Sequence, residues 1–305
     1  MRVIITGGTG FLGRSLGTDL VKEGHEVIVL SRSPVNYQER LPAGMRTAQW
    51  DGKSAQGWGH LADGAGAIIN MAGDNLSSGR WTREKKKRIL NSRINAGKAV
   101  VEAVEMAKTK PGVIVQSSAV GIYGPQGDDE VTEANSLGTD FLAEICKAWE
   151  ASTARVEEMG VRRVITRTGL PLSKTGGVLP LMSLPYRLFV GGPVGDGRQY
   201  VPWIHIADET GAIRFLMNNP EASGPYNLSA PHPLTNRQFG KALAQVLRRP
   251  AIFPVPAILI KLLFGEMSII ILKGQREIPR RLLESGYRFR FSEAESALRD
   301  LYRKK

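Results

Sequence analysis

A glycine-rich turn between a strand and a helix constrains this chain more than any other feature. Residues 2–6 are a short β-branched run, which is the composition of a buried parallel strand. Glycines crowd residues 7–13, and apolar residues at helical spacing over 11–23 predict a helix that ends at Gly24. A second apolar strand follows over 26–30. The order of strand, helix and strand predicts two parallel strands joined by a crossover helix.

The spacing of the glycines indicates what this turn can hold. Gly8, Gly10 and Gly13 match the G-x-G-x-x-G pattern of dinucleotide binding, and Gly7 offers an alternative first position. Such glycines allow a tight turn, a close approach of the backbone to a pyrophosphate, and close packing of helix on strand. A glycine-rich turn without a ligand is the alternative. The predicted cofactor-binding residues of this turn are Gly7, Thr9, Gly10, Phe11, Leu12 and Gly13.

The end of the second strand indicates which dinucleotide would bind. NAD-binding units usually have an acidic residue here for the ribose 2′-hydroxyl, whereas this chain has Ser31 and Arg32. A guanidinium suits a 2′-phosphate, so we predict NADP (NADPH), with NAD the weaker alternative. An arginine that only extends along the surface at a strand end is the other interpretation. Asp51, which ends the next predicted strand, could accept from the adenine amino group or cap a turn before Gly52.

Composition narrows the class of protein. The chain has 305 residues, a net charge of +12 and one cysteine, Cys146, so it has no internal disulfide. The densest basic cluster, 85–88, has no aromatic ladder beside it, and zinc, RNP and helix-turn-helix patterns are lacking. We therefore expect a small-molecule substrate and no nucleic acid or metal. An anionic substrate would suit the positive net charge of the chain. The lone cysteine and a first strand that begins at residue 2 favour a cytoplasmic location.

The most apolar stretch of the chain lies at about 251–272. Pro254, Pro256 and Lys261 interrupt it, so it is too broken to span a membrane. We expect buried helices here and no association with a membrane.

Strands and helices alternate along the first half of the chain. Further strands are predicted at 67–70, 113–116 and 163–167, and helices at about 82–108 and 139–159. This alternation predicts an α/β fold, a Rossmann-type doubly wound parallel sheet. We assign 1–172 to this dinucleotide-binding domain, with returning segments at about 205–230. Residues 173–305 form a smaller, mostly helical substrate-side and C-terminal domain with a strand at 287–291, interleaved with the first.

Hydroxyl side chains follow the predicted strand at 113–116. Ser117 and Ser118 lie at its carboxyl end, and Tyr123 follows Ser118 by five residues. A serine that polarises a substrate oxygen and a tyrosine that donates a proton would suit acid–base chemistry, so Ser118 and Tyr123 are the catalytic candidates. Local capping by the serines and packing of Tyr123 at a domain seam are the alternatives.

Together these motifs resemble an extended short-chain dehydrogenase/reductase, the group that includes sugar-nucleotide epimerases and dehydratases. The matching segments occur in the order of that group at residues 6–13, 70–73, 95, 117–124, 167 and 205–208. Residues 191–193, 200–205 and 274–298 are similar to a divergent branch, the epimerase-family proteins, which have a C-terminal segment of their own.

The resemblance implies further contacts and an assembly. It places Met71, Ala72, Arg93 and Pro171 at an NADP cofactor, with Arg93 as a phosphate or ribose partner. The alternative interpretation of Arg93 is a plain arginine on the helix surface. Gly73, beside Ala72, is a small residue at a strand end where a cofactor can pass close to the backbone. Members of the group commonly form homodimers, so a homodimer is expected here.

One departure from the group bears on the reaction. The group uses a Tyr-x-x-x-Lys pair on the helix after the serine strand. Counting back from Lys147 gives Ala143, and alignment on Glu150 puts Leu142 and Cys146 in the two places. Three functions stay open: an NADP-dependent oxidoreductase or epimerase with its proton donor elsewhere, an NADP-binding redox sensor or regulatory protein without turnover, and, last, nucleic-acid binding.

Overall fold

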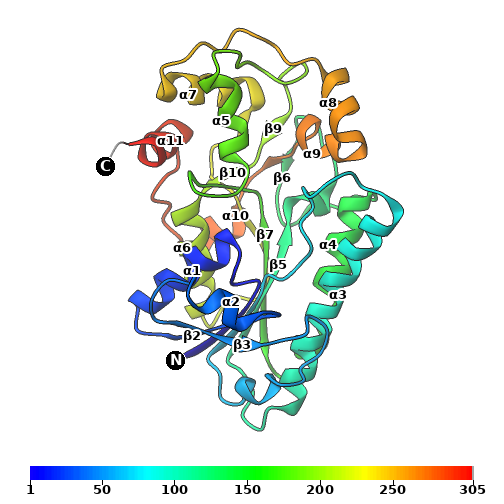
Figure 1. The fold of residues 1–305 in the computed structure, drawn as a ribbon, viewed down its shortest axis with the longest axis vertical. Coiled ribbons are helices and arrows are strands. Elements are labelled where there is room, and N and C mark those ends of the chain that lie inside the picture. The colour runs from blue at the N-terminus through cyan, green and yellow to red at the C-terminus, as the bar shows by residue number, and fades with distance from the viewer. Residues whose placement is uncertain (304–305) are drawn as a thin grey trace.

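The computed structural model describes residues 1–303; residues 304–305, the end of the predicted second domain, lie outside the described residues. Its centre is a seven-stranded sheet in the order β11-β7-β5-β4-β1-β2-β3 (Figure 1). Every pairing in this sheet is parallel. The strands are β1 (Arg2–Thr6), β2 (Glu26–Ser31), β3 (Met45–Gln49), β4 (Ala67–Asn70), β5 (Val113–Ala119), β7 (Arg162–Thr168) and β11 (Gly224–Leu228). The predicted α/β class and doubly wound sheet are confirmed.

Helices cover both faces of the sheet because alternate residues of each strand point to opposite sides. Val3 and Ile5 of β1 share a core with α1 (Phe11–Lys22) and α6 (Ile206–Asn218). Ile4 shares the other core with α3. The helices of that second face are α3 (Arg83–Met106) and α4 (Phe141–Ala151), and short helical segments are α2 (Pro34–Gln38), η1 (Gly59–Ala62), η2 (Val120–Tyr123) and η3 (Ala154–Val156).

The second part of the chain forms a smaller layer beyond the carboxyl ends of the strands (Figure 1). Its strands pair in three small sheets: β8 (Leu170–Leu172) with β10 (Trp203–His205), β9 (Tyr200–Val201) with β12 (Leu234–Thr235), and β6 (Glu130–Val131) with β13 (Arg276–Glu277). Its helices are α5 (Leu179–Arg187), α7 (Asn236–Leu247), α8 (Ala257–Phe264), η4 (Gly265–Ser268), α9 (Ile269–Leu272), α10 (Arg280–Glu284) and α11 (Ala294–Tyr302). Phe239, Leu243 and Leu298 lie in the core of this layer.

The two parts are interleaved along the chain. Residues 205–230 return from the second part to supply α6 and the edge strand β11. Near the C-terminus, β13 pairs with β6, which lies between β5 and α4 in the sequence. The chain therefore crosses between the two parts more than once.

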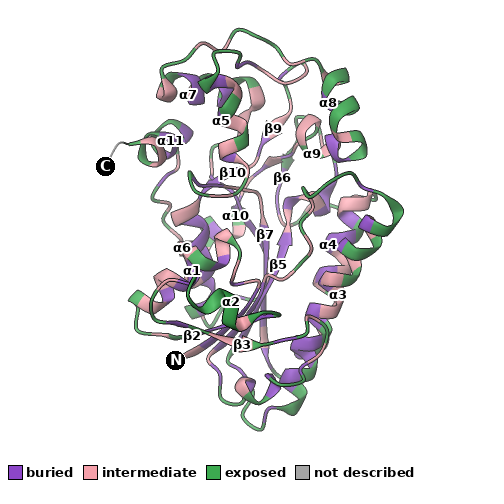
Figure 2. Ribbon diagram, in the orientation of Figure 1, coloured by how far each residue is buried: buried purple, intermediate pink, exposed green. Residues whose placement is uncertain are grey.

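Two sequence-based expectations for the second part are wrong. The stretch at 251–272 forms α8, η4 and α9, but half of its large apolar side chains are exposed, and Figure 2 shows α8 as largely exposed. Residues 287–291 form no strand, because the backbone N–H groups of Arg290 and Phe291 donate to the Asp208 carboxylate at 2.7 and 2.9 Å. In the described part of the chain, no helix combines the length and apolarity that crossing a membrane requires.

Candidate cofactor-binding site

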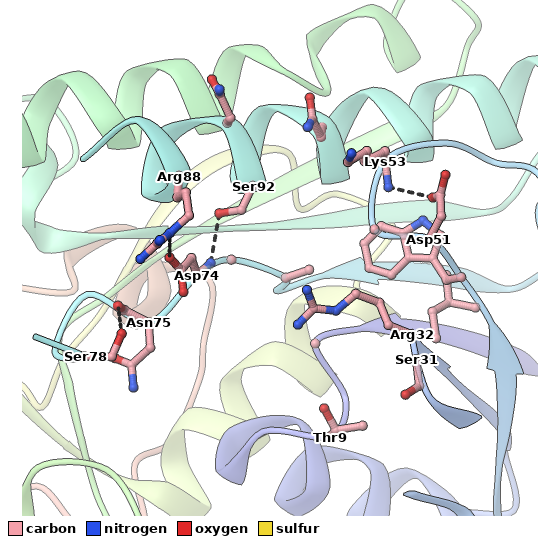
Figure 3. A pocket seen from close by; sticks show the side chains of 18 of the residues that line it. Thr9, Ser31, Arg32, Asp51, Lys53, Asp74, Asn75, Ser78, Arg88 and Ser92 are labelled. Atoms are coloured by element: carbon pink, nitrogen blue, oxygen red, sulfur yellow. Dashed lines mark hydrogen bonds and ion pairs between the residues drawn. The ribbon is translucent and has the colours of Figure 1, made fainter. Parts of the chain in front are cut away.

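A cleft of about 1320 Å³ opens at the carboxyl ends of the central strands. It runs from the loops after β2 and β3, past the glycine turn, to the loop after β4 and one side of α3. In Figure 3, Arg32 lies between Thr9 and the loop with Asp51 and Lys53, and Asp74, Arg88 and Ser92 lie further along the cleft. The predicted cofactor residues that line it are Gly7, Thr9, Ser31, Arg32, Asp51, Ala72 and Gly73.

The glycine turn fits a bound pyrophosphate. Gly7 has a φ of +72°, and a Cβ there would lie 2.8 Å from the Met71 carbonyl oxygen. A Cβ on Gly13 would lie 2.5 Å from the Gly8 Cα, so the helix can approach the turn only with glycine in place. No side chain caps the N-terminus of α1, whose first helical hydrogen bond runs from Arg14 N to Gly10 O at 2.9 Å. Free N–H groups of the first helical turn therefore remain for an anion.

Three polar residues at strand ends hold the backbone on the far side of the cleft. The Thr6 hydroxyl donates to Asn70 Oδ1 at 2.7 Å, and the Asn70 amide donates to Gln116 Oε1 at 2.8 Å. Thr6 Oγ1 also accepts from the N–H groups of Met71 and Ala72, each at 3.1 Å. All three side chains are fully buried. The sequence analysis missed them, although each is a polar residue near the carboxyl end of an apolar strand.

Two cations and one carboxylate mark the end of the cleft near β2 and β3. Arg32 and Lys53 are both exposed and line the cleft, and the Arg32 side chain passes beside Gly52. Asp51 accepts from the N–H groups of Lys53 and Ser54 at 2.7 and 2.9 Å, so it caps the turn that carries Lys53. Slight burial by itself would raise the pKa of Asp51, but the hydrogen bonds from these N–H groups outweigh it, so the pKa is lowered. The turn-capping interpretation of Asp51 is thus realised at the wall of the cleft.

Arg93 lies behind the loop after β4, next to Gly73 at the cleft wall. Its guanidinium is buried and donates to the carbonyl oxygens of Asp74 and Ile89, at 3.0 and 3.1 Å. It also lies 4.8 Å from the centre of the Trp149 ring and packs against Gly73. Burial lowers the pKa of Arg93. Arg93 therefore supports the loop after β4 from behind, and the surface interpretation is wrong because the side chain is buried; its contact with a phosphate or ribose stays a prediction.

Several other predicted cofactor residues lie beside the cleft without lining it. Met71 packs into the core, and Gly10, Leu12 and Gly13 contribute backbone at the α1 terminus. Phe11 packs against Gly176 and Gly177, in the segment that also contacts Pro171. These residues form the support of the turn and of the entrance to the second layer.

Tyr123 is not placed as a proton donor. It is fully buried, its hydroxyl donates to Asn227 Oδ1 at 2.6 Å, and it accepts from Arg167 Nη1 at 3.0 Å. Burial raises the pKa of the Tyr123 hydroxyl. Arg167 in turn donates two hydrogen bonds to the Glu150 carboxylate, at 2.9 and 3.0 Å. The burial and the partners of Tyr123 on β7 and β11 favour the alternative interpretation, a packed aromatic side chain, and its acid–base role stays a prediction.

Ser118 lies deeper than a residue that meets a substrate from the cleft. Its side chain is 4% exposed, and within residues 1–303 its hydroxyl has no hydrogen-bond partner of ordinary geometry. It adjoins the Cys146 thiol, whose pKa burial raises to about 11. Leu142, which one of the two alignments pairs with Cys146, packs beside Gly121. The part of α4 next to Ser118 therefore carries a thiol and an aliphatic side chain.

A parallel sheet with a glycine turn, a free helix N-terminus and a cleft across its strand ends defines a nucleotide-binding α/β protein. The model of the NAD dependent epimerase/dehydratase family matches residues 3–229, and a second model, a domain of unknown function (DUF1731), matches residues 255–301. The chain belongs to the NAD-dependent epimerase/dehydratase family. The resemblance to the epimerase branch of the extended short-chain dehydrogenases/reductases is confirmed.

Relatives and solved structures agree along the whole chain. Epimerase family protein YfhF of Bacillus subtilis is 41% identical over 302 residues, with 99% of this chain and 98% of YfhF covered. Human epimerase family protein SDR39U1, whose crystal structure contains NADPH, is 33% identical in sequence. The two structures match with a TM-score of 0.89 over 99% of each chain. Thermus thermophilus UDP-glucose 4-epimerase with NAD, 19% identical with a TM-score of 0.77 and 99% coverage of both chains, shares the fold.

Proposed function

We propose that this chain binds NADPH in preference to NADH and uses it as an oxidoreductase or epimerase on a small carbonyl or hydroxyl compound. The observation that carries the cofactor preference is the pair of exposed cations, Arg32 and Lys53, at the end of the cleft next to β2. An acidic residue at position 32 would repel a 2′-phosphate, whereas a guanidinium binds it with charge-assisted hydrogen bonds. The NADPH in the structure of human SDR39U1, 33% identical, supports this assignment.

Different residues of the cleft would bind different parts of the cofactor. The N–H groups at the start of α1 would hold the pyrophosphate, and Arg32 with Lys53 would hold the 2′-phosphate. The loop after β4, fixed by Thr6, would lie against the ribose on the nicotinamide side. When bound, the nicotinamide supplies hydride transfer, while the protein binds and orients the reactants.

The basic cluster at 85–88 supports a small anionic ligand over nucleic acid. Lys85 is buried, lines the cleft and donates to Asp74 at 2.9 Å and to Ser78 at 2.6 Å. Its charge and hydrogen bond lower the pKa of Asp74 against the opposing effect of burial. Lys86 pairs with Glu266. Through these contacts the lysines of the cluster point to the cleft and to the second layer. They therefore do not form the continuous basic surface that nucleic-acid binding would need.

A second candidate is an NADP(H)-binding sensor or regulatory protein without turnover. The environment of Ser118 favours it, because neither alignment of α4 supplies a tyrosine beside Ser118, where the Cys146 thiol lies, and because Tyr123 is buried. In this case the cofactor would change the population of conformations without being consumed.

One titration distinguishes the two candidates. Purified protein receives NADPH or NADH, followed by nicotinamide fluorescence and calorimetry, and the tighter complex then receives a panel of carbonyl compounds and sugar nucleotides. Oxidation of NADPH with any panel member supports the enzyme. Tight NADPH binding without turnover supports the sensor. Equal binding of NADH and NADPH contradicts the assignment of Arg32, and a Gly10→Val variant, whose side chain would fill the pyrophosphate position, serves as the non-binding control.

A further inference from the structure

The exposed apolar side chains of this protein are concentrated at one end. Most of the large ones in the described chain lie in two stretches, 181–190 and 252–270, which we call the apolar end face. The exposed fractions reach 68% for Leu181 and 70% for Ile252. In Figure 1, α5 and α8, which carry much of this face, lie at the end of the molecule away from β1–β3. Apolar surface gathered in this way marks an interaction site.

Helix α8 contributes an outer face without a polar side chain other than Lys261. Ile258, Leu259, Leu262 and Leu263 are 45% to 66% exposed, while Ile260 alone is buried. A helix that is apolar on all sides is stable only where its outer face also leaves water. With eight residues α8 is about 12 Å long, much shorter than the hydrocarbon core of a bilayer, so it can only lie along a surface.

The two stretches are joined through their backbones. Phe253 N donates to Gly191 O at 3.1 Å, and Val255 N donates to Pro193 O at 2.9 Å. The segment after α5 therefore runs beside the segment before α8. Leu181, Leu184 and Leu188, spaced at helical intervals, extend the face along α5.

The segments that carry the apolar end face have many more basic than acidic residues. Within residues 179–200 and 241–275 the only carboxylates are Asp196 and Glu266, and Glu266 pairs with Lys86. The cations of the same stretches are Arg187, Arg198, Lys241, Arg248, Arg249, Lys261 and Lys273. Arg249 lies over the exposed Phe189 ring at 4.4 Å, so cations and apolar groups are intermixed.

We propose that the apolar end face docks on the surface of a bilayer that contains anionic lipid. Apolar side chains surrounded by Lys and Arg fit the boundary between acyl chains and anionic headgroups. A second copy of the chain fits less well, because a two-fold interface brings the same cations opposite one another. The proposal reverses the expectation from the interrupted stretch at 251–272, since docking on a membrane does not require spanning it. It is independent of the cofactor and of turnover.

Sedimentation of the full chain with vesicles tests the proposal. Vesicles of phosphatidylcholine alone are compared with vesicles of equal parts phosphatidylcholine and phosphatidylglycerol, at low and high salt. We expect binding to the anionic vesicles, weakened by salt, and a decrease of about tenfold or more in the double variant Leu262→Gln/Leu263→Gln. Lys261→Glu should weaken binding as well. Leu283→Gln, at an exposed leucine outside the face, should leave it unchanged.

Other outcomes overturn the proposal. Absence of binding to anionic vesicles, equal binding to neutral vesicles, or an equal loss in Leu283→Gln would each contradict it. Sedimentation equilibrium of the same variants identifies the competing occupant: a dimer that Leu262→Gln/Leu263→Gln dissociates, without vesicle binding, would assign the face to a second copy. Because the substituted side chains are exposed, circular dichroism should show unchanged folding in every variant.

Discussion

Arg32 occupies the position after β2 where a carboxylate would select NAD, and Lys53 faces the same end of the cleft from the turn capped by Asp51. These positions could be predicted in part from the sequence, because the place of the residue after the second strand follows from the motif. Lys53 could not be predicted, since only the fold brings the loop after β3 to Arg32. A local sequence pattern carries no information on contacts between segments that are distant in the chain.

Replacing Arg32 by Asp should reverse the cofactor preference. A carboxylate repels the 2′-phosphate and can accept from the 2′-hydroxyl, so we expect NADPH affinity to fall roughly tenfold to a hundredfold and NADH affinity to rise. Fluorescence titration with both cofactors measures the change. Arg40→Asp, at an exposed arginine outside the cleft, is the matched charge reversal and should have little effect. An unchanged ratio of the two affinities would disprove the role of Arg32.

Tyr123→Phe should affect stability and leave cofactor binding unchanged. The variant removes a buried hydroxyl that joins Asn227 to Arg167, and we expect the free energy of unfolding to decrease by about 1–3 kcal/mol. Urea unfolding measures the decrease, with Tyr200→Phe, at a less buried tyrosine, as control. Loss of turnover at unchanged stability would instead restore the acid–base role that the sequence suggested.

The strands of the central sheet follow closely from the sequence, because runs such as 3–6 and 113–115 are continuously apolar or β-branched, although β5 continues beyond the predicted end to Ala119. Two elements of the second part did not follow. At 287–291 a carboxylate on α6 takes the backbone N–H groups that a strand would need, and at 251–272 the helices form but lack a covering layer. An apolar composition predicts the helix and does not reveal what packs on it.

The polar ends of β1, β4 and β5 act together on the loop that borders the cleft. Thr6→Val keeps the shape of the side chain but removes the acceptor of the Ala72 N–H and the donor to Asn70 Oδ1, while the Met71 N–H keeps only the Thr6 carbonyl oxygen at 3.3 Å. We expect a loss of about 2 kcal/mol in the free energy of unfolding and roughly tenfold weaker cofactor binding. Thr18→Val, where the hydroxyl bonds only within α1, should change both by much less. Equal effects of the two variants would contradict a role of Thr6 in the loop.

The seam between the two parts of the molecule contains buried carboxyl groups. Glu209 at the start of α6 is fully buried, and burial raises its pKa from an ordinary value of 4.5 to about 8, against the hydrogen bond from Thr168. Burial also raises the pKa of Glu277 on β13, and Glu133 and Glu209 add to the shift. At neutral pH the folded protein thus holds protons that the unfolded chain has released.

This difference makes stability depend on pH. Between the ordinary pKa of 4.5 and the folded value of about 8, the folded state binds more protons than the unfolded state, so stability decreases as pH rises through this range. Glu209→Gln keeps an acceptor for Thr168 and removes the proton exchange. We expect a smaller decrease in melting temperature across the same range, to which Glu277 and Asp208 still contribute because burial raises the pKa of both. Glu221→Gln, at an exposed carboxylate, should behave as the unsubstituted protein, and an unchanged slope in Glu209→Gln would contradict the account.

The position of β11 at the edge of the sheet has a consequence for synthesis on the ribosome. β11 pairs with β7, yet residues 169–223 separate the two strands in the chain, and 173–204 of these belong to the second part. A nascent chain that has produced the six earlier strands still exposes the backbone edge of β7 until residue 228 has left the exit tunnel. The first domain is therefore completed only after the first segment of the second, residues 173–204, has been translated, and a chain released before β11 presents an open, aggregation-prone edge.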